Sequence, residues 1–446
     1  LVLSFYIAKV ILFRNKSISN VQYNIIFCNL VGILPTKLGG NIMKSISKKV
    51  MAGLAVGAMS LSIWAPASEA ASPEKNRYYS IHLKANPKLA WDVSGNSLDN
   101  DRAIVLWNTA SRGDNEQFVF FPLDGQNYAI VNKNSGKPVT FGAGALLEGH
   151  NGIMDGQGLK QKSWTGAATE QWYLRDQGSN NYEIVNQGNQ KVASYGWQGS
   201  LADYAEYVKL DESKPSDSNR VFNIAKNGFG GVGGDIQIPG FNLDYGTFSL
   251  PTLPATGTRP AAPDYTTADP NQQLPQASNS VVVGASLVPC IMVNDSQTSD
   301  YTKIHNSPYY TLVKEEYWDK AASTVLTPGA TQSVAFKTGM SSSDQQKMTE
   351  TLSMKVGADF GLKFGDKTAA LKAEITKTLQ TETSTTNTEL SEDTVTHNFK
   401  DEVGKDTGYT LYQLATKYTL KRADGSVVSG SWTVKNNKIT KVSKSK

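Results

Sequence analysis

The longest alternation of apolar and polar residues in the chain lies between residues 354 and 379. From Met354 to Phe364 every second residue is apolar, and the residues between them are lysine, glycine or aspartate. A period of two held over eleven residues is typical of a strand with one apolar and one polar face. Gly365-Asp366-Lys367 has turn composition, and the alternation then resumes as far as Ile375. This pattern predicts a β-hairpin over about 354–379, and a short helix is the alternative for its second arm.

The predicted hairpin has the dimensions of a membrane-crossing strand pair. A strand of eleven residues at ~3.4 Å each is roughly 37 Å long, which leaves about 26 Å of height at a ~45° tilt. The apolar band of a transmembrane barrel is ~25 Å tall. Packing of the apolar face on a soluble core is the alternative. If the hairpin inserts, the residues expected to face lipid are Met354, Val356, Ala358, Phe360, Leu362, Phe364, Leu371, Ala373 and Ile375.

A second pattern repeats three times between residues 76 and 226. The strand-like motif occurs as Tyr79-Ser-Ile-His-Leu83, Asn127-Tyr-Ala-Ile-Val-Asn132 and Asn181-Tyr-Glu-Ile-Val-Asn186. Each copy is followed by another short strand and closes on a related signature: Asn115-Glu-Gln-Phe118, Thr169-Glu-Gln-Trp172 and Ser218-Asn-Arg-Val-Phe222. Repeats of short strands separated by polar turns predict threefold pseudosymmetry.

These repeats resemble the ricin-type β-trefoil lectins, whose signature is Gln-x-Trp near the end of each repeat. Gln171-Trp172 keeps part of that signature. The resemblance implies a site for galactose-like sugars in the first repeat, formed by Asp92, Trp107 and Gln117 with Asn108 beside them. The chemistry is suitable, because a carboxylate accepts hydrogen bonds from vicinal hydroxyls, an indole stacks on the apolar sugar face and an amide orients the rest.

The other two repeats lack this carboxylate. The position of Asp92 is taken by Phe141 in the second repeat and by Tyr195 in the third. We therefore expect only the first repeat to bind sugar. A trefoil that serves only as a scaffold is the alternative.

The composition changes after Asn227. A glycine run, Gly230–Gly234, is followed by seven prolines between residues 239 and 275. Such a segment favours extended, poorly packed chain, so we predict a linker over 227–285. The glycine run lacks the lysine and the helix pattern of a nucleotide-binding loop.

Residues 286–446 carry a second resemblance. Leu287-Val-Pro-Cys-Ile-Met-Val-Asn-Asp295, Ser307-Pro-Tyr-Tyr-Thr-Leu-Val313 and Tyr317-Trp318 closely resemble the Bin-like insecticidal toxins of spore-forming bacilli, the Tpp or Toxin-10 type. The resemblance implies an elongated, aerolysin-like β domain that oligomerises on gut membranes and inserts one hairpin per subunit. The expected fold class is therefore all-β: an N-terminal β-trefoil, a linker and an elongated sheet. Some relatives act as pairs, so a second toxin component is an open alternative.

Both ends of the chain suggest processing. Residues 1–42 lack the pattern of a folded protein, and we expect translation to start at Met43. Lysines, an apolar run and small residues then follow in the order of a secretion signal, so residues 43–70 are expected to be removed. At the other end, a tail with few apolar residues is expected to fray and to be trimmed by trypsin-like proteases. Its lysines are Lys435, Lys438, Lys441, Lys444 and Lys446.

Charge and reactive residues narrow the function further. Residues 1–71 hold seven of the 44 Lys+Arg and one of the 40 Asp+Glu, so their removal leaves 37 against 39 and no reason to expect a nucleic-acid partner. Only Cys290 then remains, which excludes a disulfide within the chain. The four histidines have no metal-ligand spacing, and no Gly-x-Ser-x-Gly elbow occurs. We therefore expect no catalytic residues, no metal and no cofactor.

Together these observations predict a secreted toxin that acts at a target-cell membrane. It would bind surface glycans through the trefoil and self-associate into a ring. A closed ring is required because unpaired strand edges are costly in lipid. The alternatives are a secreted lectin without pore activity and a glycosidase that carries a lectin module.

Overall fold

The computed structural model describes residues 72–108, 113–148, 152–153, 155–199, 205–225, 227–228, 243–244, 246–401 and 403–446. The expected upstream extension, 1–42, and the expected signal, 43–70, lie outside the described residues. Strands dominate the described part, which confirms the all-β fold class.

Six strands of the N-terminal part pair in a closed ring, in the order β1-β4-β5-β8-β9-β12 and back to β1. They are β1 (Tyr78–Leu83), β4 (Phe118–Pro122), β5 (Asn127–Asn132), β8 (Trp172–Asp176), β9 (Asn181–Asn186) and β12 (Phe222–Ala225). Three antiparallel hairpins complete the repeats: β2 (Leu89–Val93) with β3 (Ile104–Asn108), β6 (Val139–Phe141) with β7 (Leu159–Gln161), and β10 (Val192–Gln198) with β11 (Ala205–Asp211). The predicted threefold trefoil is confirmed.

The closing signatures build the trefoil core. Phe118, Trp172 and Phe222, one from each repeat, are completely buried. Trp91 meets Phe118 and Phe222 edge-on, at ring-centre distances of 6.0 and 5.6 Å. The first part of each signature lies in a short 3-10 turn: η2 (Asp114–Glu116), η3 (Ala168–Glu170) and η4 (Ser218–Arg220). The repeats therefore share one core. Because η2 lies just before Phe118 in the chain and contains Asn115, which donates to Asp92, it links this core to the predicted sugar site.

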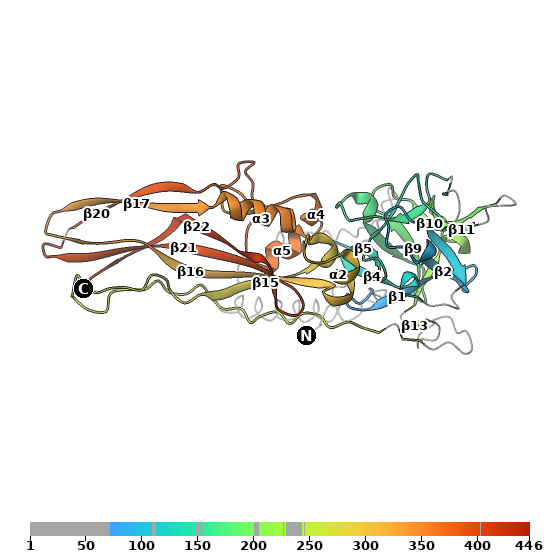
Figure 1. The fold of residues 1–446 in the computed structure, drawn as a ribbon, viewed down its shortest axis with the longest axis horizontal. Coiled ribbons are helices and arrows are strands. Elements are labelled where there is room, and N and C mark those ends of the chain that lie inside the picture. Colours follow the sequence, from blue (N-terminus) through green and yellow to red (C-terminus); the bar gives the residue numbers. More distant parts are fainter. Residues whose placement is uncertain are drawn as a thin grey trace, which may run out of the picture. The chain divides into compact units, whose positions relative to one another are not determined.

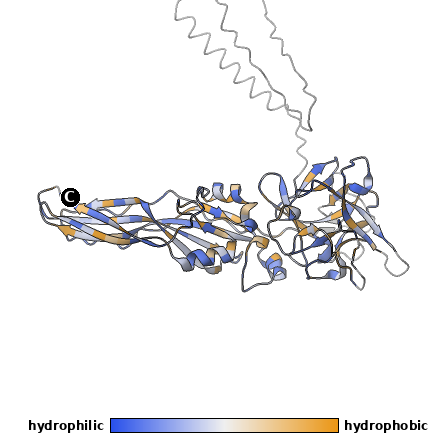
Figure 2. Ribbon diagram, turned by 90° about the horizontal axis from the view of Figure 1, so that it is seen from above, coloured by the Kyte–Doolittle hydropathy of each residue, from blue (hydrophilic) through white to orange (hydrophobic). Residues whose placement is uncertain are grey.

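The C-terminal part is a six-stranded antiparallel sheet in the order β15-β16-β21-β22-β17-β20 (Figure 1). Its strands are β15 (Val281–Pro289), β16 (Tyr309–Leu326), β17 (Thr331–Met340), β20 (Asp393–Lys400), β21 (Thr407–Lys421) and β22 (Val427–Lys444). Hydrophobic and hydrophilic residues are interspersed along the long strands (Figure 2). The remaining elements outside residues 354–379 are η1 (Ser94–Asn96), β13 (Asn227–Gly228), β14 (Leu243–Asp244), η5 (Cys290–Met292), α2 (Asp300–Asn306) and α3 (Ser342–Leu352).

The predicted hairpin at 354–379 is wrong for this structure. Its first arm folds back on itself, because β18 (Met354–Val356) pairs with β19 (Leu362–Phe364). Its second arm forms α4 (Asp366–Ala369) and α5 (Lys372–Thr378). The reversal lies between the two short strands, where Phe360 has φ +67° and a side chain on Gly361 would come within 2.6 Å of the Ser384 nitrogen. Alternation thus specified the apolar face of this arm but not the length of its strands.

The linker prediction is only half right. Residues 246–280, the proline-rich strap, form neither helix nor strand, but their chain runs along the sheet (Figure 1). Tyr265 is 2 % exposed, and its hydroxyl lies 3.0 Å from that of Thr410. Trp318 Nε1 donates to the Pro260 carbonyl at 2.8 Å, and Tyr412 Oη donates to the Pro275 carbonyl at 2.6 Å. Proline lacks an N–H but keeps its carbonyl, so aromatic side chains of the sheet can hold a proline-rich strap.

The expected fraying of the C-terminal tail is also wrong. Its lysines belong to or follow β22, an inner strand that pairs with β21 and β17. Beyond that strand, Ser445 N donates to Gly408 O at 2.9 Å, and Lys446 N donates to Thr267 O at 3.2 Å. Backbone pairing in the sheet replaces the apolar docking that the tail lacks.

Among the helices of the described residues, none has the length and the apolar composition of a membrane span.

The folded-back segment makes a prediction about stability. Leu362 is completely buried, whereas Ala373 on α5 is exposed. Leu362→Ala should therefore lower the free energy of unfolding by about 2–5 kcal/mol, and Ala373→Ser should change it by less than about 0.5 kcal/mol. Urea titration followed by tryptophan fluorescence measures both values. Equal, small effects would show that the segment is not packed as described.

Candidate functional site

A cleft of about 660 Å³ opens on the first repeat of the trefoil. Asp92, Trp107 and Asn108 line it, so the structure brings together three of the four predicted sugar-binding residues. In the β2–β3 hairpin Asp92 pairs with Val105, and Trp107 pairs with Ala90. Side chains alternate along a strand, so this register places Asp92 and Trp107 on the same face. Trp107 is 60 % exposed, which leaves its indole available for contact.

Asp92 sits at the buried end of the cleft. Its side chain is mostly enclosed, and Asn115 Nδ2 donates to Asp92 Oδ2 at 2.9 Å. Burial raises the pKa of Asp92 to about 7; the Asn115 hydrogen bond lowers the pKa, and the adjacent buried Glu116 raises it further. The carboxyl therefore titrates near neutral pH instead of staying ionised.

Gln117, the fourth predicted residue, does not reach the cleft. Its Nε2 donates to Asp114 Oδ1 at 3.2 Å, and its Oε1 accepts from Lys133 Nζ at 2.9 Å. The side chain is thus held by Asp114 and Lys133, which form an ion pair with each other. Asn115 supplies the amide next to Asp92 instead. Its position at the start of the closing signature Asn115-Glu-Gln-Phe118 was the signal available in the sequence.

Two more carboxylates line the cleft. The side chain of Glu148 lies against Gly95, where an added Cβ would be 2.9 Å from Glu148 Cβ. Glu206 comes from β11 and accepts a hydrogen bond from Tyr195 Oη at 3.0 Å. Tyr195 of the third repeat therefore supports the wall of the first-repeat cleft. The described lining contains three carboxylates and neither lysine nor arginine.

The residues predicted to face lipid are mostly hidden from water. Five of them lie in the core that the short β18–β19 hairpin, the sheet and part of the trefoil share: Met354, Val356, Leu362, Leu371 and Ile375. Phe360 and Phe364 are partly buried against the same core. Ala358 is half-buried and Ala373 is exposed. The apolar face is thus covered in the resting chain, although not by a long hairpin.

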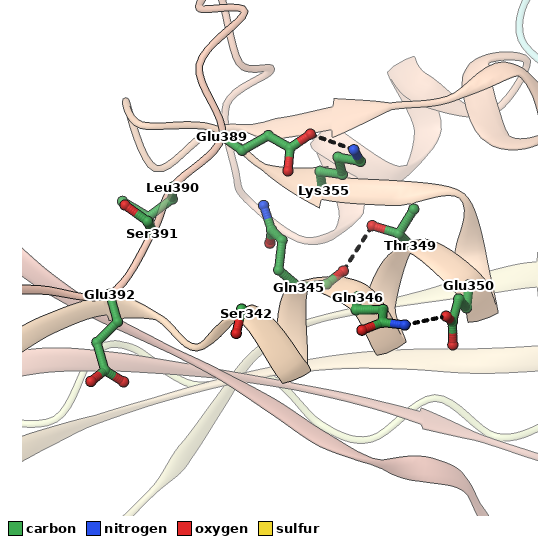
Figure 3. A pocket seen from close by; sticks show the side chains of 10 residues that line it. All are labelled: Ser342, Gln345, Gln346, Thr349, Glu350, Lys355, Glu389, Leu390, Ser391 and Glu392. Atoms are coloured by element: carbon green, nitrogen blue, oxygen red, sulfur yellow. Dashed lines mark hydrogen bonds and ion pairs between the residues drawn. The ribbon is translucent and has the colours of Figure 1, made fainter.

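A polar groove of about 600 Å³ lies beside this segment, between α3, β18 and residues 389–392 (Figure 3). Lys355 pairs with Glu389 across it, and Gln346 Nε2 donates to Glu350 Oε1 at 2.8 Å (Figure 3). Glu392 pairs with Lys337, so every charged group of the lining has a partner. In the described ranges, no group of three or more His, Cys, Asp or Glu could hold a metal ion.

Comparisons with known proteins match both parts of the chain. Residues 281–444 match the family described as insecticidal crystal toxin, P42, and residues 64–149 and 114–208 match the ricin-type β-trefoil lectin domain-like family. The chain is 27 % identical to the binary larvicide subunit BinA of Lysinibacillus sphaericus over 376 residues, which cover 83 % of this chain and 91 % of BinA. It is 32 % identical to the BinB subunit over 195 residues, 44 % of each chain.

The insecticidal crystal protein Cry35Ab1 of Bacillus thuringiensis is 25 % identical over 325 residues, 70 % of this chain and 74 % of Cry35Ab1. Its crystal structure aligns with a TM-score of 0.67 at 21 % identity, covering 83 % of this chain and 90 % of that one. The two chains therefore share a fold from the trefoil through the C-terminal sheet.

The buried carboxyl in the cleft predicts a pH-dependent stability. Because the folded pKa of Asp92, about 7, lies above its ordinary value of 3.8, the folded state holds the proton more tightly. Below about pH 4 the carboxyl is protonated in both the folded and the unfolded state, so it leaves the free energy of unfolding unchanged. As the pH rises from there through 7, the unfolded state loses the proton more readily, and the free energy of unfolding falls by a few kcal/mol. Asp92→Asn should therefore raise Tm at pH 8.5 and leave Tm near pH 4 unchanged. Thermal unfolding from pH 4 to 9 measures this, with the exposed Asp99→Asn as control; a uniform shift at all pH values would contradict it.

Proposed function

We propose that this chain, whose residues 281–444 belong to the insecticidal crystal toxin P42 family and which is homologous to BinA, BinB and Cry35Ab1, is a secreted pore-forming toxin. It binds a glycan on a target-cell surface, self-associates and inserts one strand pair per subunit. The observation that carries the proposal is the alternating segment, held inside a core in a chain that also presents a lectin cleft.

Glycan binding is supported by the geometry of the cleft. An exposed indole and a carboxylate on one face of a hairpin can stack on a sugar ring and accept hydrogen bonds from two of its hydroxyls. The Asn115 amide fixes the orientation of that carboxylate. The carboxylates of Glu148 and Glu206 repel anionic sugars, so we expect a neutral galactose-like sugar and weaker binding of sialylated forms.

Insertion is supported by the connection between β17 and β20. These strands pair from Thr331↔Lys400 to Thr338↔Asp393, and residues 341–392 join them. Both ends of residues 341–392 are therefore attached to the same end of one antiparallel strand pair. The segment can unfold and lengthen both strands without passing through any other part of the chain. Its apolar residues would move from a protein core to lipid, and burial of each would still contribute ~1.5–3 kcal/mol.

A single strand pair leaves unpaired edges, which are costly in lipid, so insertion requires several subunits. With two strands each, about seven copies would form a porin-sized ring. We propose a ring of this chain; a ring that includes a second toxin component is the alternative. A secreted lectin without pore activity would bind the same vesicles and release no dye.

The cleft assignment is tested on a glycan array. At pH 8.5, where the Asp92 carboxyl is ionised, Asp92→Ala removes a charged acceptor worth ~1.5–3 kcal/mol, so binding of galactose-terminated glycans should fall about 10- to 150-fold. Asp176→Ala, an exposed aspartate of the second repeat, is the matched control and should bind normally. Sialylated glycans should bind a few-fold better to Glu148→Gln and Glu206→Gln than to the wild type, and less so at high salt. An unchanged array signal for Asp92→Ala would contradict the assignment of this cleft as the glycan-binding site.

Insertion is tested by two neighbouring residues that are both exposed on α5. Ala373→Arg should leave the soluble fold intact but place a charge on the lipid face near mid-depth, at ~2–4 kcal/mol per subunit. Dye release from vesicles should then be lost. Glu374→Arg puts the same side chain on the lumen face, where conductance should persist with altered ion selectivity. Normal dye release by Ala373→Arg would exclude this segment as the inserting element.

A further inference from the structure

We propose that the trefoil also acts as a clamp, which holds the second arm of the insertion segment in its helical resting form and must release it before insertion. This inference rests on the proposed pore-forming function. The clamp consists of two trefoil loops, the β4–β5 turn at residues 123–125 and the loop at 164–166. The β4–β5 turn contacts α5 and Ala370, one of the residues that join the two helices, and the loop at 164–166 contacts α4.

The β4–β5 turn supplies the cap that α5 lacks. Leu371, at the cap position of α5, makes no side-chain capping hydrogen bond. Asp124 accepts instead, with Oδ2 3.0 Å from the Ala373 amide and Oδ1 3.3 Å from the Glu374 amide. The Asp124 amide also donates to the Ala370 carbonyl at 2.6 Å. A carboxylate on unpaired amides at a helix start stabilises the helix, so Asp124 favours the helical form of this arm.

The second loop closes on α4. Trp164 is 3 % exposed, and its Nε1 donates to the Lys367 carbonyl at 2.7 Å. Its ring belongs to the same core as Leu371 and Ile375. Gly166 has φ +89°, and a Cβ there would lie 1.9 Å from the Asp366 carbonyl oxygen. The two backbones therefore approach so closely that a side chain at Gly166 would force them apart.

These contacts exist only while the arm is helical. In a strand pair, the amides of Ala373 and Glu374 would alternate between the two strand edges instead of pointing together at one carboxylate. The core that Trp164 shares with Leu371 and Ile375 would also be lost. The domain that carries the glycan cleft thus opposes insertion, and weakening its hold should speed pore formation.

The test uses the full chain and vesicles of phosphatidylcholine that contain a galactose-terminated glycolipid. Asp124→Ala should raise hydrogen exchange at the Ala373 and Glu374 amides about tenfold and increase the rate of dye release several-fold. Asp176→Ala, at the end of β8 beside the β8–β9 turn of the second repeat, should change neither. Asp124→Cys combined with Ala373→Cys gives a reversible lock, in which the oxidised protein releases no dye and reduction restores release.

Two outcomes distinguish a failure of the clamp hypothesis from a failure of the proposed pore-forming function. If the wild type releases dye but Asp124→Ala and the oxidised lock release it at the same rate, the clamp is refuted and the pore-forming function stands. If the wild type releases no dye from vesicles that it binds, pore formation is refuted and the clamp loses its role with it. The double-cysteine variant keeps the test valid even if Asp124→Ala folds poorly, because its reduced and oxidised forms share one sequence.

Discussion

The resting structure depends on keeping the apolar residues of segment 354–379 out of water. One core achieves this by joining residues from three sources: Val119, Phe121 and Trp164 of the trefoil, Met354 and Ile375 of the segment, and Tyr418 and Trp432 of the sheet. Each large side chain contributes ~1.5–3 kcal/mol when buried. Removal of any one source would expose apolar surface on the other two. The trefoil is therefore part of the fold of the segment as well as the domain that carries the cleft.

The cleft illustrates the opposite requirement. The predicted role of Asp92 as a charged acceptor requires an ionised carboxylate, yet the side chain is enclosed beside Glu116, and burial raises its pKa to about 7. A more open position would keep it ionised but would lose the strong interactions that a dry site offers. The buried aromatic core of the three repeats supplies the stability that allows such a group to remain. The predicted binding carboxyl thus opposes stability, and the packing residues of the core support it.

The sequence predicted the parts of this structure that repeat or pack locally. Three copies of one motif indicated the trefoil, and the spacing within the first copy predicted that Asp92 and Trp107 lie together, as they do in the lining of one cleft. Gln117 was misplaced because spacing cannot reveal that Lys133 and Asp114 hold its amide. The proline-rich strap was misjudged for a similar reason, since its partners Trp318 and Tyr412 are distant in sequence. In both cases the outcome depends on contacts between residues that are far apart in the sequence.

The largest difference, at α5, comes from a pattern that fits two structures. Leu371, Ile375 and Leu379 are spaced by four, which suits one face of a helix and also one face of a strand. All three are buried in the helical form. Ala373 separates the two structures, because it would join the apolar face of a strand but is exposed on the helix. Because an alanine is small and weakly apolar, its free energy differs little between the apolar face of a strand and the exposed face of a helix. A larger apolar residue there would favour the strand, and a charged one would favour the helix.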